Sequence, residues 1–120
     1  MTKVFKLFTA LLIALGLSVS LSACAQQVDA SKATAIIDVR TATEFASGHL
    51  EGAVNMDVQS SEFASEIATL DPSGVYLIYC HSGRRAGLAI DQMKAAGFKN
   101  LTNLGGYADA SNATGLPLVQ

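Results

Sequence analysis

The residues best suited to chemistry lie in "YLIYCHSGRRAG", residues 76 to 87, where an apolar run ends at a cysteine and a polar, cationic loop follows. The apolar run predicts a buried strand, and the residues from Arg84 onward predict a helix. At the carboxyl end of a parallel strand, Cys80 would face a helix N-terminus, where unpaired amides attract anions. Gly83 lets the loop curl so that successive N–H groups converge. Helix N-termini and nearby cations favour a thiolate, so the stretch predicts a nucleophilic sulfur in an anion-binding loop.

The segments that must position this loop alternate between strand and helix patterns. Strands are predicted at 35–39, 52–58, 75–80 and 100–104, and helices at 42–47, 60–70 and 84–96, with a last short helix after a turn that begins at 105. Thr41 and Glu44 have the spacing of a capping box at the start of the first helix. Alternation of this kind predicts a single small α/β domain with a central parallel sheet flanked by helices on both faces.

The first 23 residues have the order of a secretory signal. Lys3 and Lys6 precede an apolar stretch that is too short for a membrane-spanning helix, and small residues follow up to Cys24. We therefore expect residues 1–23 to be removed and the rest of the chain to be exported.

The signal ends in "LSAC", which resembles the lipobox of bacterial lipoproteins, in which the cysteine is acylated and becomes the mature N-terminus. Cleavage at an ordinary site after Ala25 is the alternative, and it stays open. Acylation of Cys24 predicts a periplasmic protein that touches the membrane only through its lipid anchor. Ala25 after the cysteine resembles lipoproteins that are sent to the outer membrane.

The mature chain divides into a short polar tether over 24–34 and one domain over 35–120. Removal of the signal leaves six basic and ten acidic residues, a formal charge of −4. That charge argues against nucleic acid or an anionic membrane surface as a partner, so any anion must be recognised locally. We expect a monomer.

Cys80 has no partner within the chain if Cys24 is acylated or cleavage occurs behind it. A single thiol in an oxidising compartment is either buried and inert or used in chemistry, and the glycine and arginines that follow favour use. A bridge between the two cysteines is the remaining alternative. The cysteines and histidines have no spacing typical of a metal site.

The sequence resembles the rhodanese domain, the sulfurtransferase module, over residues 35–118. Three stretches carry the resemblance: "IIDVRTATEFASGHLEGAVNMDV" (36–58), "YCHSGRRA" (79–86) and "NLTNLGGY" (100–107). They look like the family's D-V-R…E-[FY]…G-H-[IL]-x-G-A-x-N segment, its cysteine loop and its L-x-G-G segment. The tryptophan that follows the family's glycine pair is absent, and Tyr107 is the nearest aromatic residue. A lone exported domain looks most like the small periplasmic rhodaneses.

The resemblance implies a reaction without cofactor or metal. Cys80 would take the outer sulfur of thiosulfate, or of a similar small anionic donor, as a persulfide and pass it to cyanide or a thiol. Asp38 and Arg40 match the family's D-x-R and would support the loop through an ion pair. The implied substrate-binding residues are His81, Ser82, Gly83, Arg84 and Arg85.

The loop sequence has two alternative interpretations. Phosphatases of this architecture use C-x5-R, whereas Ala86 occupies the sixth position after the cysteine here, and a short ring of amides suits a sulfur atom better than a phosphoryl group. A non-catalytic module would keep the fold and use the loop to hold an anion or to report oxidation of Cys80. Arg84 and Arg85 are also compatible with simple solvated positions in the first helical turn.

Overall fold

The structure is a computed structural model that describes residues 27–120. The predicted signal segment, the acylation site at Cys24 and the first residues of the predicted tether lie outside the described residues.

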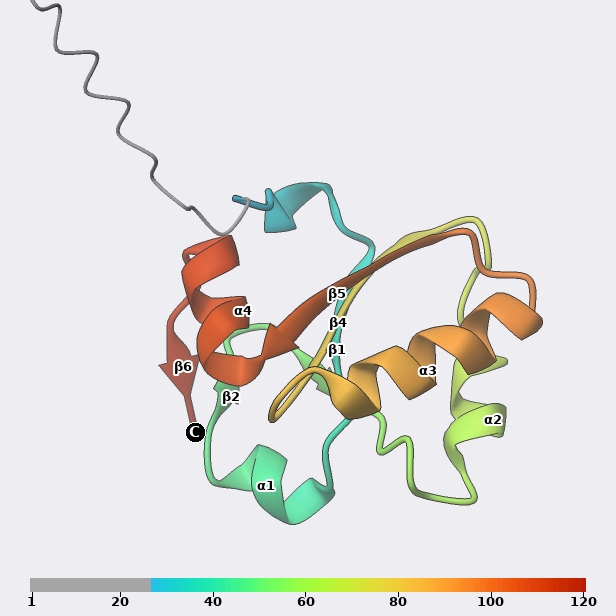
Figure 1. Cartoon of the computed structure of the whole chain (residues 1–120), viewed down its shortest axis with the longest axis horizontal. Helices are drawn as coiled ribbons and strands as arrows, with labels where there is room; N and C mark the ends of the chain where they lie inside the picture. Colours follow the sequence, from blue (N-terminus) through green and yellow to red (C-terminus); the bar gives the residue numbers. More distant parts are fainter. Residues whose placement is uncertain (1–26) are drawn as a thin grey trace, which may run out of the picture.

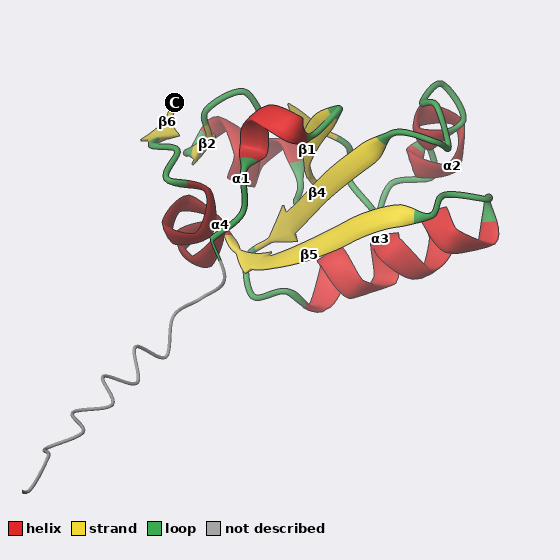
Figure 2. Cartoon of the chain, turned by 90° about the horizontal axis from the view of Figure 1, so that it is seen from above, coloured by secondary structure: helices red, strands yellow, loops and turns green. Residues whose placement is uncertain are grey.

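A four-stranded parallel sheet forms the centre of the domain (Figure 2). Its strands, in spatial order, are β3 (Val54–Asn55), β1 (Ala35–Asp38), β4 (Val75–Cys80) and β5 (Asn100–Gly106). β4 lies between β1 and β5 and is parallel to both. Five of its six residues are buried, as expected for a strand that is covered on both faces. The predicted parallel sheet is confirmed.

Helices cover both faces of this sheet (Figure 1). The α-helices within residues 27–120 are α1 (Ala42–Ala46), α2 (Phe63–Ile67), α3 (Arg84–Ala95) and α4 (Tyr107–Thr114). Helices α2 and α3 lie on one face and α4 lies on the other (Figure 1). The predicted flanking helices are therefore confirmed.

Each face has its own hydrophobic core. Ile78 packs in the cluster that includes Phe63 of α2 and Met93 of α3, whereas the adjacent Leu77 packs in the cluster that includes Ala110 of α4. Successive side chains of a strand point to opposite faces, which places neighbouring residues of β4 in different cores. This two-sided burial fixes the register of β4 and with it the position of Cys80 at its end.

A small second sheet was not predicted. Strand β2 (His49–Leu50) pairs antiparallel with β6 (Leu118–Val119) beside α4. Strands of two residues are too short to give an alternating pattern, so the sequence contains no periodic signal for them.

Several elements begin or end at other residues than the sequence predicted. β3 and α2 are shorter than the segments predicted at 52–58 and 60–70, while β5 continues beyond 104 to Gly106. Ala96, which the helical pattern placed on the buried face, is exposed just beyond the end of α3. Helix ends are the least certain part of any periodic pattern.

Residues 28–33 belong to the predicted tether, but the structure packs them on the domain. The amide of Val28 donates a hydrogen bond to the carbonyl of Ala113 in α4 at 2.8 Å. Val28, Ala30 and Ala33 contact the core cluster on the α4 face, and a 3₁₀ turn over Ala30–Lys32 shapes the segment. Because these apolar side chains pack against the core, the packed domain begins earlier than the predicted boundary at 35.

Within residues 27–120, no helix has the length and apolar character needed to cross a membrane.

Candidate active site

Cys80 is the last residue of β4, and its side chain is fully buried, with 0% of its surface exposed. The Sγ atom accepts a hydrogen bond from the amide of Gly83 at 2.8 Å. Gly83 adopts a left-handed φ of 99°, and α3 begins at the next residue. The residues after the strand therefore fold back over the sulfur and present at least one N–H group to it.

The first turn of α3 supplies further donors at the same place. Its first intrahelical hydrogen bond runs from the amide of Gly87 to the carbonyl of Gly83 at 3.1 Å. The amides of Arg84, Arg85 and Ala86 precede that bond, so they have no acceptor within the helix. These amides and the helix dipole favour an anion at the cysteine loop.

The loop covers the thiol. Among the predicted substrate-binding residues, His81, Ser82 and Arg84 are exposed, whereas Gly83 and Arg85 are partly buried. Cys80 has no exposed surface, and these residues follow it directly in the chain. Their assignment to substrate stays a prediction.

The glycine pair at the end of β5 provides the surface on which the loop rests. A Cβ atom on Gly83 would lie 3.3 Å from the Cα of Gly105, and one on Gly106 would overlap the carbonyl oxygen of His81. The side-chain amide of Asn103 donates to the carbonyl of Gly83 at 3.1 Å. Only residues without side chains allow the two segments to approach so closely. The sequence motif contained both glycines but gave no indication of the contribution from Asn103.

Arg85 forms a bidentate ion pair with Glu44. Its Nη1 and Nη2 atoms donate to Oε1 and Oε2 at 2.8 and 2.9 Å. Hydrogen bonds from Arg85 hold the pKa of Glu44 down at about 2, and Glu44 in turn raises the pKa of Arg85. Glu44 also completes the predicted capping box with Thr41. Sequence reasoning assigned it only that capping role, because the contact joins residues 41 positions apart.

Asp38 and Arg40 form the predicted ion pair, and both are buried. The Nη2 atom of Arg40 donates to Oδ2 of Asp38 at 2.7 Å, and its Nε atom donates to both carboxylate oxygens at 3.0 and 3.1 Å. Nη2 also donates to the carbonyl of Gly48 at 2.6 Å, which ties the pair to the segment before β2. The prediction that these residues pair is confirmed.

Tyr107 connects this ion pair to the cysteine loop. The guanidinium carbon of Arg40 lies 5.0 Å from the centre of the Tyr107 ring. The Tyr107 ring also lies 5.6 Å from that of His81, the residue that follows Cys80. Tyr107 thus provides an aromatic surface beside the loop in a chain that has no tryptophan.

Tyr79 is close to the same ion pair, with its ring centre 5.8 Å from the guanidinium carbon of Arg40. Its hydroxyl accepts a hydrogen bond from the amide of Leu50 at 2.9 Å, and burial raises the pKa of Tyr79. The residue before Cys80 is therefore anchored to β2, which limits movement at the end of β4. No sequence pattern indicated this contact, because Leu50 is 29 positions away.

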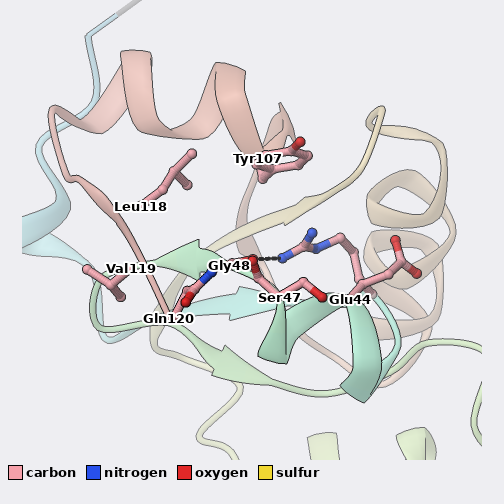
Figure 3. A pocket seen from close by; sticks show the side chains of 8 residues that line it. Glu44, Ser47, Gly48, Tyr107, Leu118, Val119 and Gln120 are labelled. Atoms are coloured by element: carbon pink, nitrogen blue, oxygen red, sulfur yellow. Dashed lines mark hydrogen bonds between the residues drawn. The ribbon is translucent and has the colours of Figure 1, made fainter.

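A cavity of about 270 Å³ lies next to the loop, between α1, the start of α4 and β6 (Figure 3). Its lining residues are Arg40, Glu44, Ser47, Gly48, Tyr107, Leu118, Val119 and Gln120. Cys80 does not line it, but Glu44 and Tyr107 contact the loop residues Arg85 and His81. The cavity therefore adjoins the cysteine loop from the side.

Between residues 27 and 120, no three His, Cys, Asp or Glu side chains come together in a group able to hold a metal ion. The site instead consists of a buried sulfur that accepts a hydrogen bond from the Gly83 amide at the start of α3, with two ion pairs in the same region.

Comparison with known sequences matches residues 20–113 to the family of the rhodanese-like domain. The putative sulfur carrier protein YrkF of Bacillus subtilis is 35% identical over 86 residues, which cover 72% of this chain and 45% of YrkF. The thiosulfate sulfurtransferase PspE of Escherichia coli is 29% identical over 73 residues, which cover 61% of this chain and 70% of PspE. The chain thus spans less than half of YrkF.

Solved structures with the same fold include the Rhodanese_3 like domain of the Alr3790 protein from Anabaena. It superposes with a TM-score of 0.63 at 25% identity, over 72% of this chain and 98% of that domain. A rhodanese with anions from E. coli superposes with a TM-score of 0.59 at 26% identity, over 72% and 96% of the two chains.

Proposed function

The chain belongs to the rhodanese-like domain family, and on that premise we propose that it is a sulfurtransferase that carries a sulfane sulfur on Cys80. The proposed donor is thiosulfate or a similar small anion, and the proposed acceptor is cyanide or a thiol. Relatives named as thiosulfate sulfurtransferases and as a sulfur carrier support this class of chemistry.

The reaction needs two displacements at sulfur. The Cys80 thiolate attacks the outer sulfur of thiosulfate, the S–S bond of the donor breaks, and sulfite leaves with the bonding electron pair. The acceptor then attacks the outer sulfur of the Cys80 persulfide, and the Cys80 thiolate is regenerated. Cyanide becomes thiocyanate and a thiol becomes a persulfide. The steps balance without an external oxidant or reductant, and the covalent intermediate divides one transfer into two.

One observation carries the proposal: the amide of Gly83 donates to Cys80 Sγ at 2.8 Å at the mouth of α3. A hydrogen-bond donor at this position stabilises negative charge on sulfur. The outer sulfur of a persulfide would extend from Sγ toward the amides of residues 81–85, which supplies the same stabilisation to the intermediate.

Backbone amides, more than arginine side chains, are proposed to hold the donor. The guanidinium of Arg85 is already paired with the carboxylate of Glu44, and 19% of the Arg85 side chain is exposed. Its charge is therefore largely balanced before any donor arrives. Arg84 is exposed in the first turn of α3 and is the proposed cation that attracts an anionic donor to the loop.

Mass spectrometry after treatment with thiosulfate tests the proposal directly. The parent protein should gain one sulfur atom, cyanide should remove it with formation of thiocyanate, and Cys80→Ala should gain none. Cys80→Ser keeps the size of the side chain and serves as the control for folding. If well-folded parent protein gains no sulfur, the sulfurtransferase proposal fails and the anion-binding or redox-sensing alternative takes its place.

We further propose that residues 1–23 direct export and that acylation of Cys24 anchors the domain to the periplasmic face of a membrane, the outer one where the cell has two. The order of charges, apolar residues and small residues supports this proposal. Labelling of cells with a fatty-acid analogue tests it: the parent and Cys80→Ser should carry label, and Cys24→Ser should carry none. Label that persists in Cys24→Ser would refute the anchor.

A further inference from the structure

We propose that the 270 Å³ cavity beside the cysteine loop binds the organic part of the sulfur acceptor, a small uncharged thiol that carries a carbonyl oxygen. This inference rests on the proposed function, because it assumes that Cys80 passes its sulfur to a thiol. It adds a binding site and a chemical class of acceptor to that function.

Arg40 supplies the group that recognises the oxygen. The Nε and Nη2 atoms of Arg40 are occupied by Asp38 and by the carbonyl of Gly48, whereas Nη1 has no acceptor among residues 27–120. In the same part of the chain, no side-chain nitrogen is both fully enclosed and without a partner. Nη1 of Arg40 is therefore accessible, although only 4% of the residue is exposed, and Arg40 lines the cavity. A guanidinium carries two N–H groups on this atom, which a carbonyl oxygen can accept.

The charges around the cavity favour an uncharged ligand. The charge of Arg40 is balanced by Asp38 at 2.7 Å, and that of Glu44 is balanced by Arg85 at 2.8 Å. Both carboxylate oxygens of Glu44 already accept hydrogen bonds from Arg85. A ligand carboxylate would lie near two balanced pairs and gain little net attraction, while an amide or ester oxygen needs only the free N–H groups.

The walls suit a short apolar chain. In the view of Figure 3, Tyr107 and Leu118 form the upper wall, and Ser47, Gly48 and Gln120 form the lower one. Leu118 lines the cavity and is 43% exposed, so it offers apolar surface to a ligand there. A cavity of this size is at the lower limit of small-molecule sites, so it matches a short chain and not a large cofactor.

The cavity and the cysteine loop are joined at two points. The Tyr107 ring lies 5.6 Å from that of His81, and Glu44 holds Arg85. His81 and Arg85 begin and end the loop that follows Cys80. A thiol whose carbonyl group lies in the cavity can therefore direct its sulfur toward this loop. Its thiolate attacks the outer sulfur of the Cys80 persulfide, the S–S bond to Cys80 breaks, and the acceptor leaves as a persulfide.

Acceptor kinetics with a variant that fills the cavity test the inference. The acceptors are N-acetylcysteamine, which has a carbonyl group, butane-1-thiol, which has none, and cyanide, which is too small to need the cavity. In the parent, KM should be lower for N-acetylcysteamine than for butane-1-thiol. Leu118→Trp should raise the KM for N-acetylcysteamine relative to that for cyanide about fivefold or more, because the indole displaces the ligand.

Leu88→Trp is the matched control. Leu88 is a similarly exposed leucine on α3, at 50% exposure, and it does not line the cavity. This variant should leave the ratio of the two KM values as in the parent. Equal changes in both KM values in Leu118→Trp, or no preference of the parent for the carbonyl-bearing thiol, would overturn the inference.

A binding measurement separates failure of the cavity from failure of the proposed function. N-acetyl-S-methylcysteamine cannot accept sulfur, and it should shift the backbone NMR signals of Gly48, Tyr107 and Leu118 in the parent protein. Shifts in a parent that transfers no sulfur would refute the function but keep the site. Sulfur transfer without such shifts would refute the site and keep the function.

Discussion

Two glycines at the ends of α3 share one backbone angle but have different surroundings, and they allow a sharp test of the cysteine loop. Gly83 precedes the helix and Gly97 follows it, each with a φ of 99°. A Cβ atom on Gly83 would lie 3.3 Å from the Cα of Gly105, whereas one on Gly97 would meet nothing within 4 Å. Gly83→Ala and Gly97→Ala therefore both place a side chain on a residue with positive φ, and only the first disturbs the contact between the loop and β5.

The strain of a left-handed residue with a side chain is about 1–2 kcal/mol, and both variants should lose about this much stability. For a domain of this size, such a loss lowers the melting temperature by about 4–16 °C. Gly83→Ala should also displace the amide that donates to Cys80 Sγ at 2.8 Å. A hydrogen bond to a charged group contributes about 1.5–3 kcal/mol, so persulfide formation should slow by about tenfold to a hundredfold or more in this variant alone.

Two assays read these effects separately. Thermal unfolding followed by circular dichroism gives the loss of stability, and mass spectrometry at timed intervals after addition of thiosulfate gives the rate of persulfide formation. We expect both variants to lose a comparable amount of stability and only Gly83→Ala to form the persulfide slowly. An unchanged rate in Gly83→Ala would show that the Gly83 amide does not stabilise the sulfur, and the argument for the loop would fail with it.

Three other substitutions test the surroundings of the loop. Asp38→Asn leaves the buried guanidinium of Arg40 without a counter-charge and should cost about 3–5 kcal/mol in urea unfolding, and a cost below about 1 kcal/mol would contradict the importance of the pair. Glu44→Gln keeps a capping side chain but removes the charge that faces Arg85, so it should lower the free energy of unfolding by about 1 kcal/mol or less at neutral pH. The folded pKa of Glu44 is depressed to about 2, so the parent should be more stable than Glu44→Gln by the full amount above about pH 4.5, and this difference should vanish as the pH falls toward about 2. A difference in unfolding free energy that is independent of pH would argue against the ion pair. Gly106→Ala places a methyl group against the carbonyl oxygen at the start of the cysteine loop and should slow persulfide formation, whereas a normal rate would show that the loop does not rest on β5.

The central fold and the position of Cys80 at the end of a buried strand were predictable because both depend on local patterns. The apolar run over 75–80 specifies a strand that is buried on both faces, and the glycine and helix pattern after it specify a turn into a helix. Thr41 and Glu44 lie three positions apart, so their capping box is also readable in the sequence. The pairing of Asp38 with Arg40 was expected only from the resemblance to the rhodanese domain, and the structure shows it at the end of β1.

Only the tertiary structure decided which distant groups surround the loop. Glu44 meets Arg85 across 41 residues, Tyr79 meets Leu50 across 29, and β6 closes the cavity by pairing with β2. None of these contacts has a periodic signal, since each depends on how α1, α4 and the sheet pack together. The sequence by itself therefore determined a cysteine at a strand end before a helix, because strand and helix are local. The packing determined that the sulfur lies beneath the loop, that the charge of Arg85 is balanced and that a cavity opens beside it, because these properties arise where remote segments meet.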